Sequence, residues 1–278
     1  MSLNIFFDVT GTNKQAFHAK LDRLLAKKEA IAQLELVVSE VRKDHPGMNP
    51  RDLYLIIAPD FIGRDAFERY FLVMGYGVKM KRAFRRATDS SGVIRFDNLI
   101  EDIELNDVNQ VWVSDITYYR IGDVFYYITF IMDLYSRLIV GHAVSRGLRT
   151  EMTTLPALKC GLRTRGTTLI PGLIFHSDGG GQYYSTKFRK LTTEVGILNS
   201  MGESVYENPN AERLNGVLKN NYIRHYAPKD YDQLVKQTIK AVRMYNTQKP
   251  HSSLNKMNPV AFENKIRCLR KKESVILH

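Results

Sequence analysis

Three consecutive runs of β-forming residues, joined by short turns, constrain the fold of this chain most strongly. The runs occupy 110–118, 124–133 and 138–144, with turns at 120–122 and 135–137. Short turns join antiparallel neighbours, so the three runs predict an antiparallel meander. Helix and strand patterns alternate after the meander. We therefore expect an α/β fold, in which a mixed sheet carries helices on its faces.

The later elements are short and alternate in type. They are a helix over 150–162, a strand over 173–175, a helix over 186–195, a strand over 197–200, and helices over 209–222 and 230–245.

The region before the meander reads as helical. Apolar residues recur at helical spacing over 14–42, which predicts one long helix or two with a break, and HPGMNP at 45–50 ends it. Residues 51–82 predict two short helices around a turn near 58–64, followed by a basic segment. This arrangement is compatible with a helix-turn-helix DNA-binding segment and equally with a small helical support domain.

The boundaries follow from these changes of pattern. We expect a helical region over 1–82, a linker over 83–107, an α/β core over 108–226, and a C-terminal helix with a basic tail over 227–278.

The charge balance favours a nucleic-acid partner. Forty Lys and Arg residues against 29 Asp and Glu residues give a net charge of +11. Ribosomal proteins, membrane-surface proteins and ordinary basic enzymes share such a balance, so charge alone is a weak signal. No apolar run reaches the roughly 18 residues that a membrane span needs, and the N-terminus lacks the pattern of a secretory signal. Cys160 and Cys268 stand far apart without a CxxC pattern, so we expect reduced thiols, no zinc site and a cytoplasmic location.

Two aspartates stand at positions that need an explanation. Asp115 lies between apolar and aromatic residues in VWVSDITYY, where a buried carboxylate needs a metal or a cationic partner; a strand-edge aspartate facing water is the alternative. Asp178 follows a short apolar strand and precedes three glycines, which suits a ligand site beyond a strand end; an ordinary Asp–Gly turn is the alternative.

A third acid lies near the start of a predicted helix. Glu212 comes shortly after Pro209, which suits the first turn of a helix. Lys219 lies two turns further along the same face, and Asn215 lies on that face between them. A solvated glutamate on an amphipathic helix is the alternative interpretation.

Taken together, Asp115, Asp178 and Glu212 form a carboxylate set that can hold two Mg²⁺ or Mn²⁺ ions. Two such ions serve in-line displacement at phosphorus, because one activates the attacking oxygen and the other stabilises the leaving oxygen. Basic residues elsewhere would then position the DNA backbone. The aromatic residues Trp112, Tyr118 and Tyr119 are more typical of a core or a sheet face than of a base-stacking platform.

Several motifs in the same order resemble those of one known family. They are HPGMNPRDLY, GRDAFERYF, VWVSDITYY, YYITFIMDLYSRLIVGHAVS, HSDGGGQYYS, NAERLNGVLKN and YNTQKPHSSLNKMNPVAF, and they span nearly the whole chain. This set is similar to the DDE transposases of bacterial insertion sequences, specifically the downstream-frame OrfB products of the IS three family, which are relatives of retroviral integrases.

The resemblance implies a ribonuclease-H-like catalytic core with Asp115, Asp178 and Glu212 as metal-binding acids. It also implies that Lys219 contacts DNA, and we add Asn215 and Arg213 as predicted DNA-binding residues. One departure concerns spacing: 33 residues (179–211) separate the second aspartate from the glutamate, about two fewer than the family pattern. The shortening falls around 202–210, in a predicted loop where length changes are tolerated best.

The implied activity is cleavage at the ends of an insertion sequence and transfer of the strand into target DNA. The implied partners are double-stranded DNA carrying terminal inverted repeats, target DNA, further copies of the chain and an upstream-frame DNA-binding protein, with no membrane. Two alternatives stay open: a non-catalytic OrfB fragment that binds transposon ends and modulates the active fusion, and a nuclease that cuts without joining.

Overall fold

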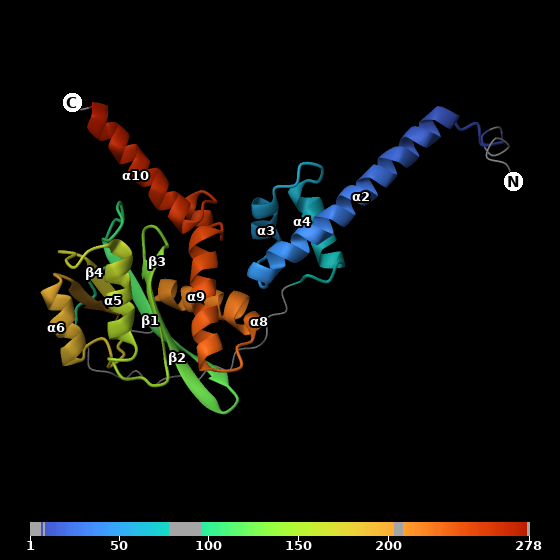
Figure 1. The fold of residues 1–278 in the computed structure, drawn as a ribbon. Coiled ribbons are helices and arrows are strands. Elements are labelled where there is room, and N and C mark those ends of the chain that lie inside the picture. Colours follow the sequence, from blue (N-terminus) through green and yellow to red (C-terminus); the bar gives the residue numbers. More distant parts are fainter. Residues whose placement is uncertain (1–6, 8, 78–95, 203–207, 277–278) are drawn as a thin grey trace. The chain divides into compact units, whose positions relative to one another are not determined.

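A computed structural model describes residues 7, 9–77, 96–202 and 208–276 (Figure 1). The chain divides into two compact units, residues 1–77 and 78–278, which are described separately. Within the described ranges, no helix combines the length and the apolar character that crossing a membrane requires.

The first unit contains one long helix and two short ones. Helix α2 (Lys14–Asp44) is continuous, and it ends before the predicted stop at 45–50. Helix α3 (Pro50–Ile57) begins with proline in its first turn, where the missing N–H costs nothing, and the Asn49 side chain accepts a hydrogen bond from the Asp52 N–H. Helix α4 (Arg64–Val73) follows after a short connection, so the two predicted short helices are confirmed.

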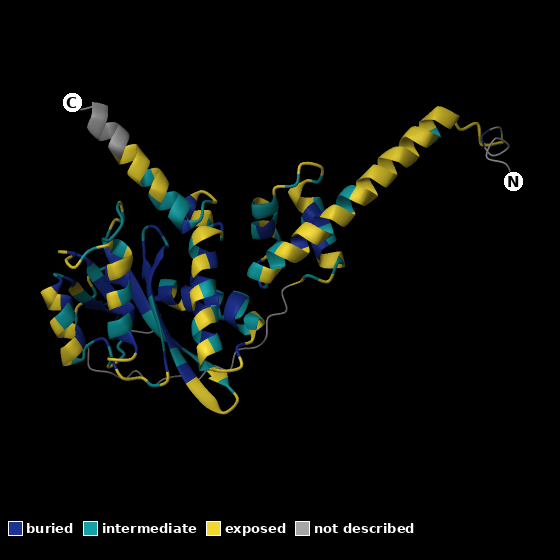
Figure 2. Ribbon diagram, in the orientation of Figure 1, coloured by how far each residue is buried: buried dark blue, intermediate teal, exposed yellow. Residues whose placement is uncertain are grey.

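A small core holds the first unit together. It draws only on the last part of α2 and on the segments that follow it; the members are Leu34, Val38, Met48, Leu53, Phe67 and Phe71. The earlier part of α2 leaves Leu21, Leu24 and Leu25 exposed, and Figure 2 shows that end of the helix almost entirely as exposed surface. A DNA-binding role for α3 and α4 stays a prediction.

The second unit is built on a five-stranded sheet in the order β3-β2-β1-β4-β5. Strands β1, β2 and β3 pair antiparallel, and β4 and β5 run parallel to β1. This order and these directions are those of the ribonuclease-H-like fold, so the predicted fold class is confirmed. The strands are β1 (Val111–Ile121), β2 (Val124–Asp133), β3 (Ile139–Ser145), β4 (Ile174–Ser177) and β5 (Leu198–Met201).

Helices cover both faces of this sheet. Helices α5 (Thr154–Arg165) and α6 (Thr186–Glu194) pack on the face of the sheet toward which the Trp112 side chain points. Helices α7 (Pro209–Leu218) and α9 (Tyr231–Thr247) pack on the opposite face, toward which Val111 and Val113 point. Successive strand residues point to opposite faces, so the one strand β1 supplies both cores.

Helix α5 lies unusually close to β3. A Cβ atom added at Gly141 would stand 2.3 Å from the carbonyl oxygen of Ala157, so the absence of a side chain there permits the contact.

The end of the chain forms a further helix that the sequence did not predict. Helix α10 (Pro259–Ile276) occupies most of the expected basic tail, and the Asn258 side chain accepts a hydrogen bond from the Ala261 N–H at its start. Arg165 ties this helix to the sheet, because its guanidinium bonds both Glu263 (Nη1 to Oε2, 2.7 Å) and Asp133 (Nη2 to Oδ2, 2.9 Å).

The described part of the predicted linker has no helix or strand and packs on the second unit. Ile100, Ile103 and Leu105 contact the α7 and α9 core, and the Leu99 N–H donates to Ser200 Oγ at 2.9 Å. Residues 83–95 of that linker lie outside the described residues.

Candidate active site

The three predicted acids come from three adjacent elements. Asp115 lies within β1, Asp178 directly follows β4, and Glu212 lies in the first turn of α7. Strands β1 and β4 are parallel neighbours whose paired residues include Ser114 and Ser177, so each aspartate follows a paired serine. The structure thus brings Asp115 and Asp178 to one edge of the sheet.

The start of α7 is fastened to the same edge. The Asn208 side chain, directly before the helix, donates from Nδ2 to the Ser114 carbonyl oxygen at 2.9 Å. This bond places the first turn of α7, and with it the exposed Glu212 side chain, beside β1. The predicted loop at 202–210 precedes the helix, and residues 203–207 of it lie outside the described residues.

Asp115 is largely buried and has few partners. Its Oδ1 accepts from the Ile116 N–H at 2.7 Å, and its Oδ2 accepts from Asn215 Nδ2 at 2.7 Å. Burial, and after it the negative charge of Asp178, raise the pKa of Asp115 to about 7, although the bonds from Asn215 and Ile116 oppose the rise. Glu212 adds a smaller push in the same direction.

Asp178 is in a similar situation. Burial raises its pKa above the ordinary range, the Gly180 N–H bond to Oδ1 (3.1 Å) lowers it, and Glu212 raises it. Each acid therefore acts electrostatically on another, which requires the three carboxylates to lie close together.

The three acids carry the ligand type of a hard divalent cation. Among the described residues, no three His, Cys, Asp or Glu side chains are grouped so that they could hold a metal ion. Oxygen donors are nevertheless what Mg²⁺ prefers, and it keeps waters and substrate phosphates in its shell. A cation would also relieve the repulsion that raises the pKa of Asp115.

Lys219 lies on the face of α7 that Asn215 and Glu212 share. It is the first residue of a π-helical turn, η2 (Lys219–Ile223), which continues α7. Its Nζ donates to Thr117 Oγ1 at 2.9 Å and to the Tyr118 carbonyl oxygen at 3.3 Å, so the ammonium lies against β1. Burial and then Arg224 lower the pKa of Lys219, while Asp115 raises it.

Arg213 lies elsewhere. It is exposed on a different side of α7, and its charge acts on Arg137, Tyr245 and His251 rather than on the acids. The structure therefore groups five of the six predicted site residues and leaves Arg213 outside that group.

Tyr183 and its partner Ser114 lie near the acids but were absent from the prediction. Tyr183 is fully buried beneath the carboxylates, and its hydroxyl shares a 2.9 Å hydrogen bond with Ser114 Oγ. Burial, then Asp178 and Asp115, raise the pKa of Tyr183 well above its ordinary value, which keeps the phenol neutral. A tyrosine five positions after an aspartate has no distinctive sequence signal, so only the fold reveals this neighbour.

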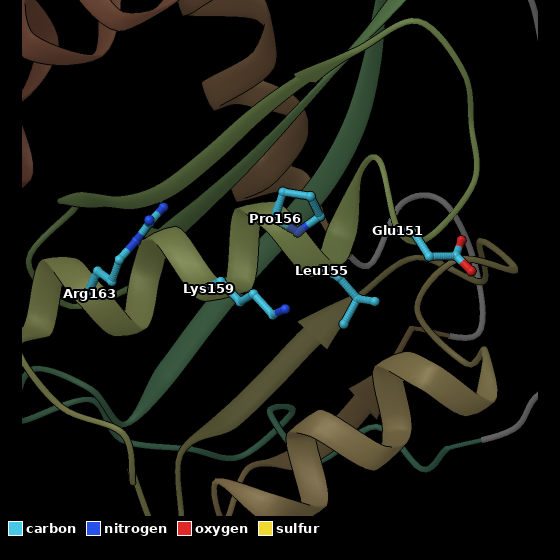
Figure 3. A pocket seen from close by; sticks show the side chains of 5 residues that line it. All are labelled: Glu151, Leu155, Pro156, Lys159 and Arg163. Carbon is cyan, nitrogen blue, oxygen red and sulfur yellow. The ribbon is translucent and has the colours of Figure 1, made fainter.

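Two further side chains, one on β1 and one on β4, are internal. Trp112 is completely buried, which confirms its interpretation as a core residue. His176 is buried between strands, with Nδ1 3.0 Å from Ser200 Oγ. A cavity of about 340 Å³ lies along α5 (Figure 3), but Glu151, Leu155, Pro156, Lys159 and Arg163 line it, and none of the three predicted acids takes part.

A ribonuclease-H-like sheet with one acid on β1, one directly after β4 and one on a flanking helix is typical of the class of integrase-type DNA-processing enzymes. Models described as integrase core domain match residues 106–205 and 193–259.

Relatives from insertion elements extend this match along the chain. The 31 kDa protein of insertion element IS600 from Shigella sonnei is 30% identical over 239 residues, which cover 84% of this chain and 87% of that protein. The transposase for insertion sequence element IS629 from Shigella sonnei is 30% identical over 205 residues, which cover 73% of this chain and 68% of that protein. The chain belongs to the DDE transposases of bacterial insertion sequences, in the IS three family, and its general function is DNA transposition.

A solved structure gives a weaker match. The catalytic core domain of HTLV-2 integrase in complex with magnesium superposes with a TM-score of 0.46 at 20% identity, covering 55% of this chain and 95% of that chain. The family assignment rests on the sequence relatives and not on this superposition.

Proposed function

We propose that this chain cleaves DNA at the ends of its insertion sequence and joins the freed 3′-hydroxyl to target DNA, using Asp115, Asp178 and Glu212 to bind two Mg²⁺ or Mn²⁺ ions. The proposal is supported by the parallel pairing of β1 with β4, after whose paired serines Asp115 and Asp178 stand, and by the bond from Asn208 to the Ser114 carbonyl oxygen directly before the first turn of α7. The raised pKa of Asp115, due to burial and then to Asp178 and Glu212, agrees with it. Acids that repel one another at a largely buried position are costly unless an external cation compensates their charge.

Each residue then has a task. The three carboxylates supply oxygen ligands, and the bond from Asn215 Nδ2 fixes the orientation of the Asp115 carboxylate. Lys219, held by Thr117 and the Tyr118 carbonyl, places a positive charge where a DNA phosphate would lie next to the acids. Bound there, the divalent ions would supply activation of the attacking oxygen and neutralisation of the leaving oxygen.

The partners follow from the chemistry. Double-stranded DNA with terminal inverted repeats is the proposed first substrate and target DNA the second. Two ends must be held together for joining, so we propose that several copies of the chain assemble on DNA. An upstream-frame DNA-binding protein is a further proposed partner.

The test is a cleavage and joining assay with labelled DNA that carries the terminal repeat of the flanking element. We expect nicked and joined products with Mg²⁺ or Mn²⁺ and none with a chelator. The Glu212→Gln variant should lose both products, whereas Glu194→Gln, which changes an exposed acid paired with Lys190 at the surface, should keep them.

The outcomes separate the alternatives. Binding without any cleavage by the wild-type chain, with or without the upstream-frame protein, would contradict the proposal and support a non-catalytic fragment. Nicking without joining would support a nuclease.

A further inference from the structure

Strand β1 extends well beyond the strand beside it. It runs from Val111 to Ile121, but β4 pairs with it only as far as Ser114. From Asp115 onward, the described strands border β1 only on the β2 side. The β1–β2 hairpin therefore projects from the sheet (Figure 1), and its tip is exposed (Figure 2).

Two neighbouring aromatic rings on this projecting hairpin are flanked by cations, one of them supplied by η2. Lys219 Nζ lies 4.9 Å from the centroid of the Tyr118 ring, and the Tyr118 ring lies 5.7 Å from that of Phe125 in an edge-to-face arrangement. The guanidinium carbon of Arg120 lies 5.8 Å from the Phe125 ring. We call these four residues, Lys219, Tyr118, Phe125 and Arg120, the hairpin track.

The track is accessible. Phe125 is 37% exposed and the Arg120 side chain is 58% exposed, so neither is part of a core. Arg120 also bonds Asp123 (Nη2 to Oδ1, 2.6 Å) and the Gly122 carbonyl oxygen, which orient the guanidinium beside the ring. Nearby Arg224 adds positive charge, since it acts on both Lys219 and Tyr119.

The track also comes close to the acids. Asp115 and Tyr118 are three strand residues apart, so their side chains point to opposite faces of β1. Lys219 connects the two faces, because its Nζ donates to Thr117 Oγ1, which shares the face of Asp115, and lies 4.9 Å from the centroid of the Tyr118 ring. Adjacent rings flanked by cations suit a strand whose bases are unpaired, because each ring can stack on a base while the cations contact phosphates. Bases inside an intact duplex do not offer their faces in this way.

We propose that the hairpin track binds the unpaired nucleotides of the DNA strand that leads away from the cleaved phosphate. This inference rests on the proposed function and adds a single-strand binding surface to it. Tyr118 and Phe125 stack on bases, while Lys219 and Arg120 contact the backbone. The track therefore favours DNA ends that are frayed or carry an overhang.

The test uses the full-length chain without divalent metal and a single strand of roughly twelve nucleotides that contains 2-aminopurine. We expect quenching of the fluorescent base on binding. Phe125→Leu and Tyr118→Leu should weaken binding of this strand about tenfold, since one base loses its stacking partner, and should leave binding of the matching duplex nearly unchanged.

A control variant and a further test variant complete the experiment. Phe262→Leu removes a ring that pairs with Tyr135 outside the track, at 5.6 Å, and should bind the single strand like the wild type. Arg120→Gln changes only an exposed side chain, so it should fold normally and reduce the dependence of single-strand binding on salt.

The proposal is overturned if the wild-type chain does not bind or quench the single strand, or if folded Leu variants bind it as tightly as the wild type. Failure of the proposed function looks different: the wild-type chain would bind and quench the single strand but never cleave DNA with metal present.

Discussion

Two buried aspartates on neighbouring strands of the same sheet have opposite surroundings. Asp133, at the end of β2, accepts bonds from the backbone N–H groups of Asn109, Tyr135 and Ser136 and forms an ion pair with Arg165. Asp115, on β1, has one backbone and one side-chain donor and faces two further acids.

The two aspartates differ in whether groups of the chain compensate their charge. Burial raises the pKa of both, but donors and Arg165 then oppose the rise at Asp133, whereas Asp178 adds to it at Asp115. A carboxylate whose partners all come from the chain stabilises the fold. A carboxylate without a cationic partner can bind a cationic ligand, but it lowers the stability of the fold.

The largest expected effect is on catalysis at Asp115. Asp115→Asn removes a proposed metal ligand, so cleavage should fall by at least about a thousandfold, which corresponds to about 4 kcal/mol of activation free energy. The melting temperature of the metal-free protein should stay constant or rise, because a repelled negative charge is lost. A clear fall in melting temperature would show that Asp115 stabilises the fold, as Asp133 does, and would contradict the comparison.

The next effect is on stability at the other aspartate. Arg165→Met leaves the Asp133 and Glu263 carboxylates buried without their cation, so the free energy of unfolding should fall by about 3–5 kcal/mol. Urea denaturation measures it. Lys187→Met, which removes an exposed ion pair with Glu151, is the matched control and should leave the free energy of unfolding nearly unchanged. Equal effects of the two substitutions would contradict the assignment of Asp133 as a carboxylate that stabilises the fold.

A smaller effect is expected at Asn215. Asn215→Ala removes the donor that lowers the pKa of Asp115 and orients its carboxylate, so metal-dependent cleavage should fall about 10–100-fold. The rise of activity with pH should also move to higher pH. A uniform loss of activity with an unchanged pH profile would indicate a purely structural role.

The smallest effect is a pH dependence of stability. The native pKa of Asp115 is about 7 and its ordinary value is 3.8, so between these values the native state holds a proton that the unfolded chain releases. The contribution of Asp115 to stability therefore falls as pH rises through that window and is constant above it. In chelator, the melting temperature of Asp115→Asn relative to the wild type should rise from pH 4 to 7. No trend would show that Asp115 titrates normally.

The sequence predicted the sheet and the grouping of the acids for the same physical reason. Strand alternation and helix periodicity are local patterns, and the acids stand at the ends or centres of such elements. The motifs then supplied the family and with it the expected catalytic role of Asp115, Asp178 and Glu212.

The contacts that could not be predicted from the sequence join residues that are far apart along the chain. Arg165 meets partners 32 and 98 positions away, and Asn208 reaches Ser114 across 94 positions. Helix α10 was missed although Asn258 and Pro259 are typical start signals, because a basic stretch was read as a tail. In α2, helical spacing predicted the helix correctly but not which apolar residues are buried.

Glu263, on the last helix, also has a consequence for the order of folding. During synthesis the strands of the sheet leave the ribosome long before α10 does, and until then Arg165 has Asp133 but lacks its second carboxylate. The sheet can form early, yet its ion-pair network is completed only when Glu263, 98 positions after Arg165, has been made. A chain released before Glu263 would therefore carry every predicted metal-binding acid and still be more easily unfolded than a chain that contains Glu263.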